Sequence, residues 1–166
     1  MADRVRIRDA VGEDAPLILR LIRELAEYES MLDRVRITEA DIRRDGFGAT
    51  PRFACIIAEL ETGGGWEAVG YALWYHNYST FEGRAGIYVE DLYVSPHARG
   101  RQLGRALLAH LASKVRDAGG VRLDLSVLDW NPTRRFYEHL GFRGLSEWLP
   151  YRLTGEALPR LADEAL

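Results

Sequence analysis

A chain of 166 residues is long enough to bury a core without disulfides or metal ions, and we expect one domain over residues 1–166. The net charge of −3 argues against a general binder of nucleic acids or anionic membranes. The single cysteine, Cys55, lies in an apolar run and has no partner for an internal disulfide. Together with an N-terminus that lacks a signal-peptide core, these features predict a cytoplasmic protein.

The first elements are predicted from hydrophobic periodicity. Residues 5–8 alternate apolar and basic side chains, which indicates a strand. Residues 14–31 carry apolar side chains at helical spacing. Thr38 followed by Asp41 resembles a capping pattern, and we expect it to begin a short helix that ends near Gly46.

Three strands are expected in the middle of the chain. Residues 53–60 and 68–75 are strand-like runs, and the glycine-rich stretch 62–65 between them predicts a hairpin. Arg84–Val94 predicts a central strand.

The C-terminal part is expected to add a strand, a helix and further extended segments. Residues 121–127 alternate apolar and polar side chains, as in a half-buried strand. Asn131 and Pro132 are typical of a helix N-cap and first turn, and Gly141 is typical of a helix end. Residues 142–153 predict the last extended segments. The order predicts an α/β (α+β) fold, with a mixed sheet covered by helices on both faces.

The segment that follows the strand at 84–94 is the most informative one. A turn at Ser95 and Pro96 leads into a basic loop at residues 99–104. A helix with a fourfold apolar stripe then begins, and the stripe consists of Leu103, Leu107, Leu111 and Val115. Free N–H groups at the helix start favour a pyrophosphate, although an arginine-rich turn is also often simply solvated. The phosphate-binding pattern G-x-x-x-x-G-K-[ST] and the dinucleotide pattern G-x-G-x-x-G are both absent.

The loop resembles a known cofactor motif. Residues 99–104, RGRQLG, are similar to the [RQ]-x-x-G-x-[GA] acetyl-CoA loop of the GCN5-related N-acetyltransferases (GNAT), with Gln102 where the middle glycine is usual. The stretches LRLIRELAEYE, DGFG, EDLYV, VLDWN and FYEHLGF resemble the diamine (spermidine/spermine) and thialysine acetyltransferase branch. The resemblance implies a mostly antiparallel GNAT-type sheet and a homodimer, to which exposed apolar groups such as Trp148 would contribute.

The resemblance also implies how acetyl-CoA is held. The loop would bind the pyrophosphate, the strand before it would bind the pantetheine arm through its main chain, and a later segment would complete the cofactor site. One strand N–H would serve as oxyanion donor. These cofactor residues are Arg99, Gly100, Arg101, Gln102, Leu103, Gly104 and Arg105 in the loop, Leu92, Tyr93 and Val94 in the strand, and Asn131, Pro132, Thr133 and Arg134 in the later segment.

Two residues are expected to move protons. An alkylamine has a pKa of about 10.4, so a base is needed near neutral pH, and the resemblance favours Glu90 as that base. Tyr137 would protonate the departing thiolate, which is uphill by roughly 2 kcal/mol at reference pKa values. The alternatives from sequence alone are an ordinary surface acid for Glu90 and a core residue for Tyr137. In an unkinked strand Glu90 and its neighbour Asp91 would face opposite sides.

The acceptor is expected to be a small primary amine that attacks acetyl-CoA directly in a ternary complex. The resemblance implies contacts from Tyr28, Glu29, Glu90, Asp91, Asp124, Leu125 and Ser126. Fewer acids follow the pair at residues 28–29 than in polyamine acetyltransferases, which favours a lysine-like amino acid or a short diamine over spermine. The alternatives are an acetyltransferase of protein N-termini or lysines and a non-catalytic acyl-CoA-binding module. The spacing of the histidines predicts no metal site.

Overall fold

The computed structural model describes residues 4–165, which form two compact units divided between Leu128 and Asp129. The first unit contains a five-stranded sheet in the order β1-β2-β3-β4-β5. Its strands are β1 (Val5–Asp9), β2 (Ala54–Thr62), β3 (Gly65–Ser79), β4 (Arg84–Val94) and β5 (Leu123–Leu125). Its helices are α1 (Ala15–Tyr28), α2 (Glu39–Phe47) and α3 (Leu103–Asp117), with short 3-10 turns at Gly12–Asp14, Leu32–Arg34 and Pro96–Ala98.

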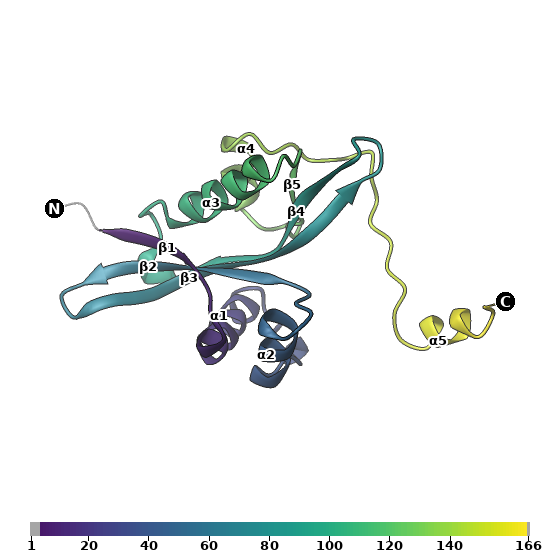
Figure 1. Cartoon of the computed structure of the whole chain (residues 1–166), viewed down its shortest axis with the longest axis horizontal. Coiled ribbons are helices and arrows are strands. Elements are labelled where there is room, and N and C mark those ends of the chain that lie inside the picture. The colour runs from purple at the N-terminus through teal and green to yellow at the C-terminus, as the bar shows by residue number, and fades with distance from the viewer. Residues whose placement is uncertain (1–3, 166) are drawn as a thin grey trace. The chain divides into compact units, whose positions relative to one another are not determined.

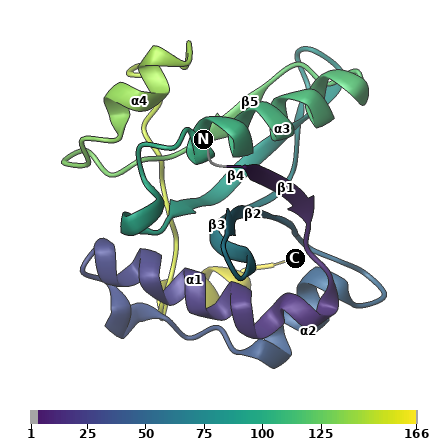
Figure 2. The same cartoon turned by 90° about the vertical axis from the view of Figure 1, so that its left-hand side faces the viewer.

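The sheet is antiparallel from β1 to β4, whereas β5 pairs with β4 in parallel. The helices α1 and α2 lie on one face of the sheet and α3 lies on the other (Figures 1 and 2). This arrangement confirms the predicted mixed sheet with helices on both faces. Between the sheet and α1 lies a core that includes Ile18, Leu21, Ile57, Tyr71 and Leu73.

The helix signals in the sequence correspond to observed caps and packing. Thr38 caps α2: its Oγ1 accepts a hydrogen bond from the Asp41 N–H at 3.2 Å, and Asp41 Oδ2 accepts one from the Thr38 N–H at 2.9 Å. The predicted stripe of α3 is buried, as its members Leu103, Leu107, Leu111 and Val115 are all at most 9% exposed. Local patterns therefore position α2 and α3 well.

Several strand bounds differ from the predictions. β3 continues to Ser79, four residues beyond the predicted end at residue 75, because its pairing with β4 extends to the pair of Ser79 and Arg84. β4 has the predicted bounds but lies fourth of five and is not the middle strand. β5 covers only three residues of the predicted 121–127 strand, because its pairing with β4 begins at Leu123 and ends at Leu125.

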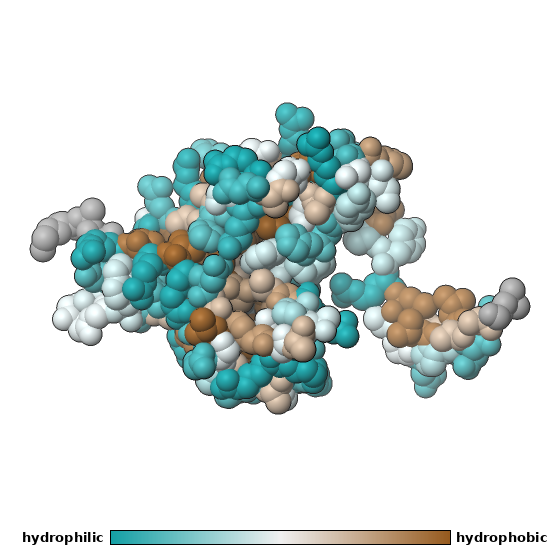
Figure 3. All heavy atoms as spheres, viewed as in Figure 1, coloured by the Kyte–Doolittle hydropathy of each residue, from teal (hydrophilic) through white to brown (hydrophobic). Residues whose placement is uncertain are grey.

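The second unit contains the helices α4 (Arg134–His139) and α5 (Ala157–Ala162). Helix α4 begins later than predicted, because Asn131 caps a preceding turn: its Oδ1 accepts a hydrogen bond from the Thr133 N–H at 2.9 Å. The extended segments predicted for 142–153 do not form strands, since no described residue pairs with them in a ladder. The apolar side chains of α5 gather on one side of that helix (Figure 3).

Candidate active site

A β-bulge in β4 organises the candidate active site. On β3, Leu73 pairs with Asp91 and the next residue, Trp74, pairs with Val89, so Glu90 is an extra residue without a partner on β3. Such a bulge bends the strand and redirects its side chains. The expectation that Glu90 and Asp91 face opposite sides holds only for an unkinked strand, and β4 is bulged at this point. The charge of Glu90 instead contributes to raising the pKa of Asp91.

Asp91 is a largely buried carboxyl group held by a tyrosine. Tyr71 lies opposite this part of β4, is fully buried, and donates a hydrogen bond from its hydroxyl to Asp91 Oδ2 at 3.1 Å. Burial is the main cause that raises the pKa of Asp91 to about 6, with further contributions from the negative charges of Glu90 and Glu29, while the Tyr71 hydrogen bond opposes the shift. Asp91 therefore changes its protonation state close to neutral pH.

The end of α1 adds a third acid to this cluster. Glu29 directly follows the last residue of α1, and burial raises its pKa. Its charge acts on both Asp91 and Tyr71. Tyr28, which precedes it, is 38% exposed. The structure thus brings together four of the predicted acceptor residues: Tyr28, Glu29, Glu90 and Asp91.

Aromatic and polar side chains continue this surface towards β5. Tyr75 and Tyr88 pair across β3 and β4, and their rings stack with centroids 5.3 Å apart. The Tyr88 hydroxyl lies 2.6 Å from the Ser126 Oγ. Tyr75 lies next to the bulge, because its neighbour Trp74 pairs with Val89. Burial and the charge of Glu90 raise the pKa of Tyr75. We name the group formed by Glu29, Tyr71, Tyr75, Tyr88, Glu90 and Asp91 the acceptor face, in which Tyr71 is buried.

The remaining predicted acceptor residues lie on β5 and just beyond it. Asp124 is aligned with Tyr88 in the parallel register, and Leu125 is aligned with Val89. Asp124 Oδ2 accepts a hydrogen bond from the Asn77 amide at 2.7 Å. Asp124 and Ser126 therefore border the acceptor face, whereas Leu125 lies at the last paired position of the two strands.

β4 extends beyond the last residue that pairs with β5. The parallel register ends at Val89, whereas β4 continues to Val94, and no other described strand pairs with this edge. The main chain of Leu92, Tyr93 and Val94, which was predicted to hold the pantetheine arm, belongs to this segment. A linear amide-bearing group can bind such an edge as an added strand does.

The loop after β4 has the backbone shape of an anion-binding turn. Gly100 has φ +80° and Gln102 has φ +60°, both in the left-handed region. The Ala106 N–H donates to the Gln102 carbonyl oxygen at 2.9 Å, so the preceding N–H groups of α3, those of Leu103, Gly104 and Arg105, have no helical partner. The positive end of the α3 dipole also favours an anion at such a helix start, and binding of a pyrophosphate here stays a prediction.

Arg99, the first residue of the loop, contacts the end of β4 and the end of α1. Its Nε donates to the Val94 carbonyl oxygen at 3.0 Å, and its guanidinium carbon lies 4.7 Å from the centroid of the Tyr28 ring and 6.0 Å from that of Tyr93. Arg101, in the loop, and Arg105, in the first turn of α3, are both exposed. The role of Arg99 as a pyrophosphate ligand remains a prediction.

The second unit carries the predicted general acid, Tyr137, on α4. Its ring contacts Phe136, with centroids 5.4 Å apart, and Phe142, with centroids 5.8 Å apart. Asn131 is buried, whereas Pro132 and Arg134 are exposed. The roles of Tyr137 and of residues 131–134 toward the cofactor stay predictions.

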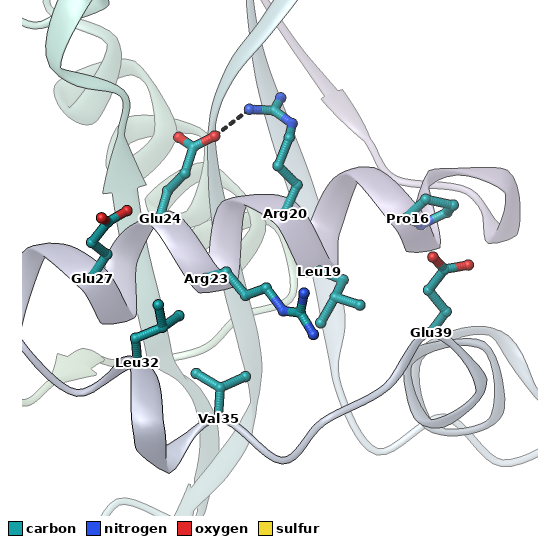
Figure 4. Close-up of a pocket in the computed structure, with 9 residues that line it drawn as sticks. All are labelled: Pro16, Leu19, Arg20, Arg23, Glu24, Glu27, Leu32, Val35 and Glu39. Atoms are coloured by element: carbon teal, nitrogen blue, oxygen red, sulfur yellow. Dashed lines mark hydrogen bonds and ion pairs between the residues drawn. The ribbon is translucent and has the colours of Figure 1, made fainter.

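A groove of about 570 Å³ runs along another side of α1 (Figure 4). It lies between α1 and the segment that leads to α2, and it contains the ion pair of Arg20 and Glu24. Its lining residues are Pro16, Leu19, Arg20, Arg23, Glu24, Glu27, Leu32, Val35 and Glu39. None of the predicted site residues lines this groove, so we do not place the reaction there.

Other features bear on cofactors and on the thiol. Cys55 is buried, and burial raises the pKa of its thiol, which disfavours the reactive thiolate. Within residues 4–165, no group of three or more His, Cys, Asp or Glu side chains is arranged to hold a metal ion. In the same range, each helix is too short or too polar to cross a membrane.

Sequence analysis missed several members of the site. Tyr71, Tyr75 and Tyr88 lie in strands where alternating aromatic residues are typical of a core, so nothing local distinguished them. Asn77 lies beyond the predicted strand end at residue 75, but β3 includes it. The available signal was that Tyr71, Tyr75 and Asn77 are separated by even numbers of residues and therefore share one face of an extended strand.

The fold is of the α+β class, with a mixed sheet whose bulged, acid-bearing strand leads into a glycine loop and a helix. The chain belongs to the Acetyltransferase (GNAT) family, whose model matches residues 19–142. It is therefore an N-acetyltransferase.

Individual relatives extend this likeness over almost the whole chain. A thialysine N-epsilon-acetyltransferase of Bos taurus is 45% identical over 96% of this chain and 98% of that protein. A spermidine/spermine N(1)-acetyltransferase-like protein 1 of Homo sapiens is 36% identical over 98% of this chain and 24% of its own length. Among solved structures, an integron cassette protein from the mobile metagenome of V. cholerae has a TM-score of 0.79 at 25% identity and covers 99% of both chains.

Proposed function

We propose that this acetyltransferase moves the acetyl group of acetyl-CoA to the primary amine of a small molecule, either a lysine-like amino acid or a short diamine. The observation that carries the proposal is the cluster of Glu29, Glu90 and Asp91 at the β4 bulge. Carboxylates beside aromatic rings suit an alkylammonium group. The thialysine and spermidine/spermine acetyltransferases to which the chain is similar are named for amines of this kind.

The cluster gives the acceptor amine a charged anchor and a proton acceptor. Near pH 7 an alkylamine is almost entirely protonated, because its pKa is about 10.4. Asp91 is largely ionised above pH 6 and attracts the ammonium group. Glu90 is exposed and takes the proton from the amine, directly or through a water molecule.

The transfer itself then balances with two protein groups. The neutral amine nitrogen attacks the thioester carbonyl carbon, the new C–N bond forms, and the C–S bond breaks. An N–H on the β4 edge stabilises the oxyanion, and Tyr137 donates a proton to the thiolate. The nitrogen releases its second proton to solvent as the amide forms, and Tyr137 takes a proton back from solvent. The loop at Arg99–Arg105 supplies backbone amides and arginines for the CoA pyrophosphate, while Leu92–Val94 holds the pantetheine arm.

We further propose a homodimer in the cytoplasm. Exposed apolar side chains in the second unit support an interface between copies, among them Trp148 at 69% exposed and Leu149 at 74%. The single buried thiol fits a reducing compartment. The mass in solution, measured by analytical ultracentrifugation, tests the dimer.

The function is tested by product formation with a panel of acceptors. The purified protein is incubated with acetyl-CoA and lysine, diamines, spermine or a lysine-containing peptide, and CoA release and product mass are followed. We expect acetylated short amines and little acetylated peptide. Acetylation of the peptide alone would indicate a protein acetyltransferase, and absence of any product despite CoA binding would indicate a non-catalytic module.

A further inference from the structure

A polar cluster at the junction of β3, β4 and β5 has binding capacity that the fold does not use. The Arg122 Nε forms an ion pair with Asp124 Oδ2 at 2.9 Å, and the Asn77 amide donates to the same oxygen at 2.7 Å. Arg122 Nη2 donates to the Tyr78 carbonyl oxygen at 3.2 Å. We name Asn77, Arg122 and Asp124 the head-group cluster.

A donor and an acceptor of the cluster are available to a ligand, and the Asn77 Oδ1, which is buried, also has no hydrogen-bond partner among the described residues. Arg122 Nη1 and Asp124 Oδ1 form no hydrogen bond or ion pair with any residue in the described part of the chain. The two side chains are 40% and 32% exposed, so a ligand can reach them. The cluster therefore presents a cationic donor beside an anionic acceptor.

The absence of a side chain at Gly86 makes room for this arrangement. A Cβ at Gly86 would lie 2.7 Å from the Asn77 Oδ1 and 2.8 Å from the Arg122 Cγ. Arg122 and Asn77 thus approach each other over the backbone of β4, and Asn77 fixes the Asp124 carboxylate that pairs with Arg122. The positions of the charged groups are set by the sheet rather than by a mobile loop.

The cluster lies on the same face of the sheet as the acids of the bulge. Tyr71, Tyr75 and Asn77 alternate along β3, so their side chains share one face. Tyr71 contacts Asp91 at one end of this row, and Asn77 contacts Asp124 at the other. Asp124 is aligned with Tyr88, which precedes Glu90 and Asp91 by two and three residues, a separation of roughly 7–10 Å along the strand.

We propose that the head-group cluster binds the zwitterionic α-amino acid end of a lysine-like acceptor, an inference that rests on the proposed function. Arg122 pairs with the α-carboxylate and Asp124 with the α-ammonium group. The aliphatic chain lies across the stacked rings of Tyr75 and Tyr88, and the terminal amine reaches Glu90 and Asp91. A diamine without the carboxylate leaves Arg122 without this partner. The cluster thereby selects amino acids over diamines of equal length.

The test compares lysine with 1,5-diaminopentane, which has the same carbon chain without the carboxylate. The readout is the ratio of their kcat/KM values with acetyl-CoA at saturation. We expect the wild-type protein to prefer lysine. In Arg122→Gln this ratio should fall at least tenfold, because a charge-assisted pair is lost, and Arg122→Lys should retain part of the preference. Arg84→Gln, an exposed arginine at the start of β4, is the matched control and should leave the ratio unchanged.

The outcomes separate this inference from the proposed function. If the wild-type protein acetylates the diamine as well as lysine, or if Arg122→Gln lowers both kcat/KM values equally, the head-group assignment is overturned while the acetyltransferase function stands. If the wild-type protein acetylates neither amine, the proposed function itself fails. Circular dichroism and the melting temperature of each variant identify a loss caused by misfolding, and Asp124→Asn then gives a second, independent measurement of the same ratio.

Discussion

The acceptor face and the loop before α3 present opposite charges by different means. The acceptor face uses side chains brought together from the end of α1 and from β3 and β4, and its central carboxyl group, Asp91, is largely buried beside Tyr71. The loop uses backbone N–H groups at the start of α3 and two residues of positive φ, Gly100 and Gln102. The first site therefore depends on the packing of distant segments, whereas the second depends on the conformation of a few consecutive residues.

This difference has consequences for stability and for recognition. Burying a carboxylate costs free energy, so the ionised acceptor face lowers the stability of the folded protein. Its charge also changes with pH. The loop places its N–H groups at a helix terminus, where they are unpaired in any case. Changes in the acceptor face should affect both stability and turnover, whereas changes in the loop should mainly affect cofactor affinity.

The largest effect is expected from Asp91→Asn on folding stability. The pKa of Asp91 is raised in the folded protein, so the ionised form destabilises the fold above about pH 6, and stability rises as Asp91 takes up a proton below that pH. The neutral asparagine should increase the free energy of unfolding at pH 8 by up to about 3 kcal/mol. The gain should disappear below about pH 4. Urea unfolding at both pH values measures this.

The control for that comparison is Asp33→Asn, which changes an exposed acid and should not alter the pH dependence. If Asp91→Asn is less stable than the wild type at pH 8, the surroundings of Asp91 stabilise its carboxylate. That result would contradict the claim that the ionised Asp91 destabilises the fold.

The next largest effect is expected from Glu90→Gln on catalysis. Removal of the base should lower kcat for the amine by at least about 100-fold and displace the acidic limb of the pH–rate profile. Glu82→Gln, in the turn before β4, is the control. Asp91 is the other group whose ionisation could produce the acidic limb of the pH–rate profile. An unchanged profile in Glu90→Gln would therefore identify Asp91 as the base instead of Glu90.

Tyr137→Phe is expected to have a smaller effect on turnover. Loss of the hydroxyl should lower kcat by about tenfold or more, which corresponds to about 1.4 kcal/mol, while acetyl-CoA affinity stays nearly the same. Steady-state rates and CoA titrations measure the two quantities. Unchanged turnover would remove Tyr137 from the mechanism and leave it as a side chain that packs between Phe136 and Phe142.

The smallest effect is expected in the loop. Gly100 has φ +80°, and Gly100→Ala places a side chain in a left-handed conformation that costs about 1 kcal/mol or more. The loop should relax, and CoA affinity should fall by roughly fivefold with little change in the KM for the amine. Gly63→Ala, in the hairpin between β2 and β3, is the control. A change in amine KM alone would contradict the separation of the two sites.

The same contrast explains how much could be predicted from the sequence. The bounds of β4, the cap of α2 and the stripe of α3 were predicted correctly because their signals lie within a few residues of each other. The short β5, the late start of α4 and the missing final strands depend on pairing or capping partners that a local pattern does not contain.

The acceptor face follows the same rule. Glu90 and Asp91 were found through their motif, but the bulge that reorients them arises from the register between β3 and β4. The hydrogen bond from Tyr71 and the stacking of Tyr75 on Tyr88 need the folded sheet, since each joins residues from two strands. The contact of Arg122 with Asp124 further requires space above Gly86, which a sequence pattern does not reveal.

The proposed anchoring of the acetyl donor is tested most directly by a calorimetric titration of CoA into the folded wild-type protein. We predict saturable binding with one CoA per chain that is competed by pyrophosphate and weakened by salt, because backbone amides ahead of Leu103 and neighbouring arginines hold the phosphates. Absence of heat and of thermal stabilisation with well-folded protein would contradict the central claim that this loop anchors the acetyl donor.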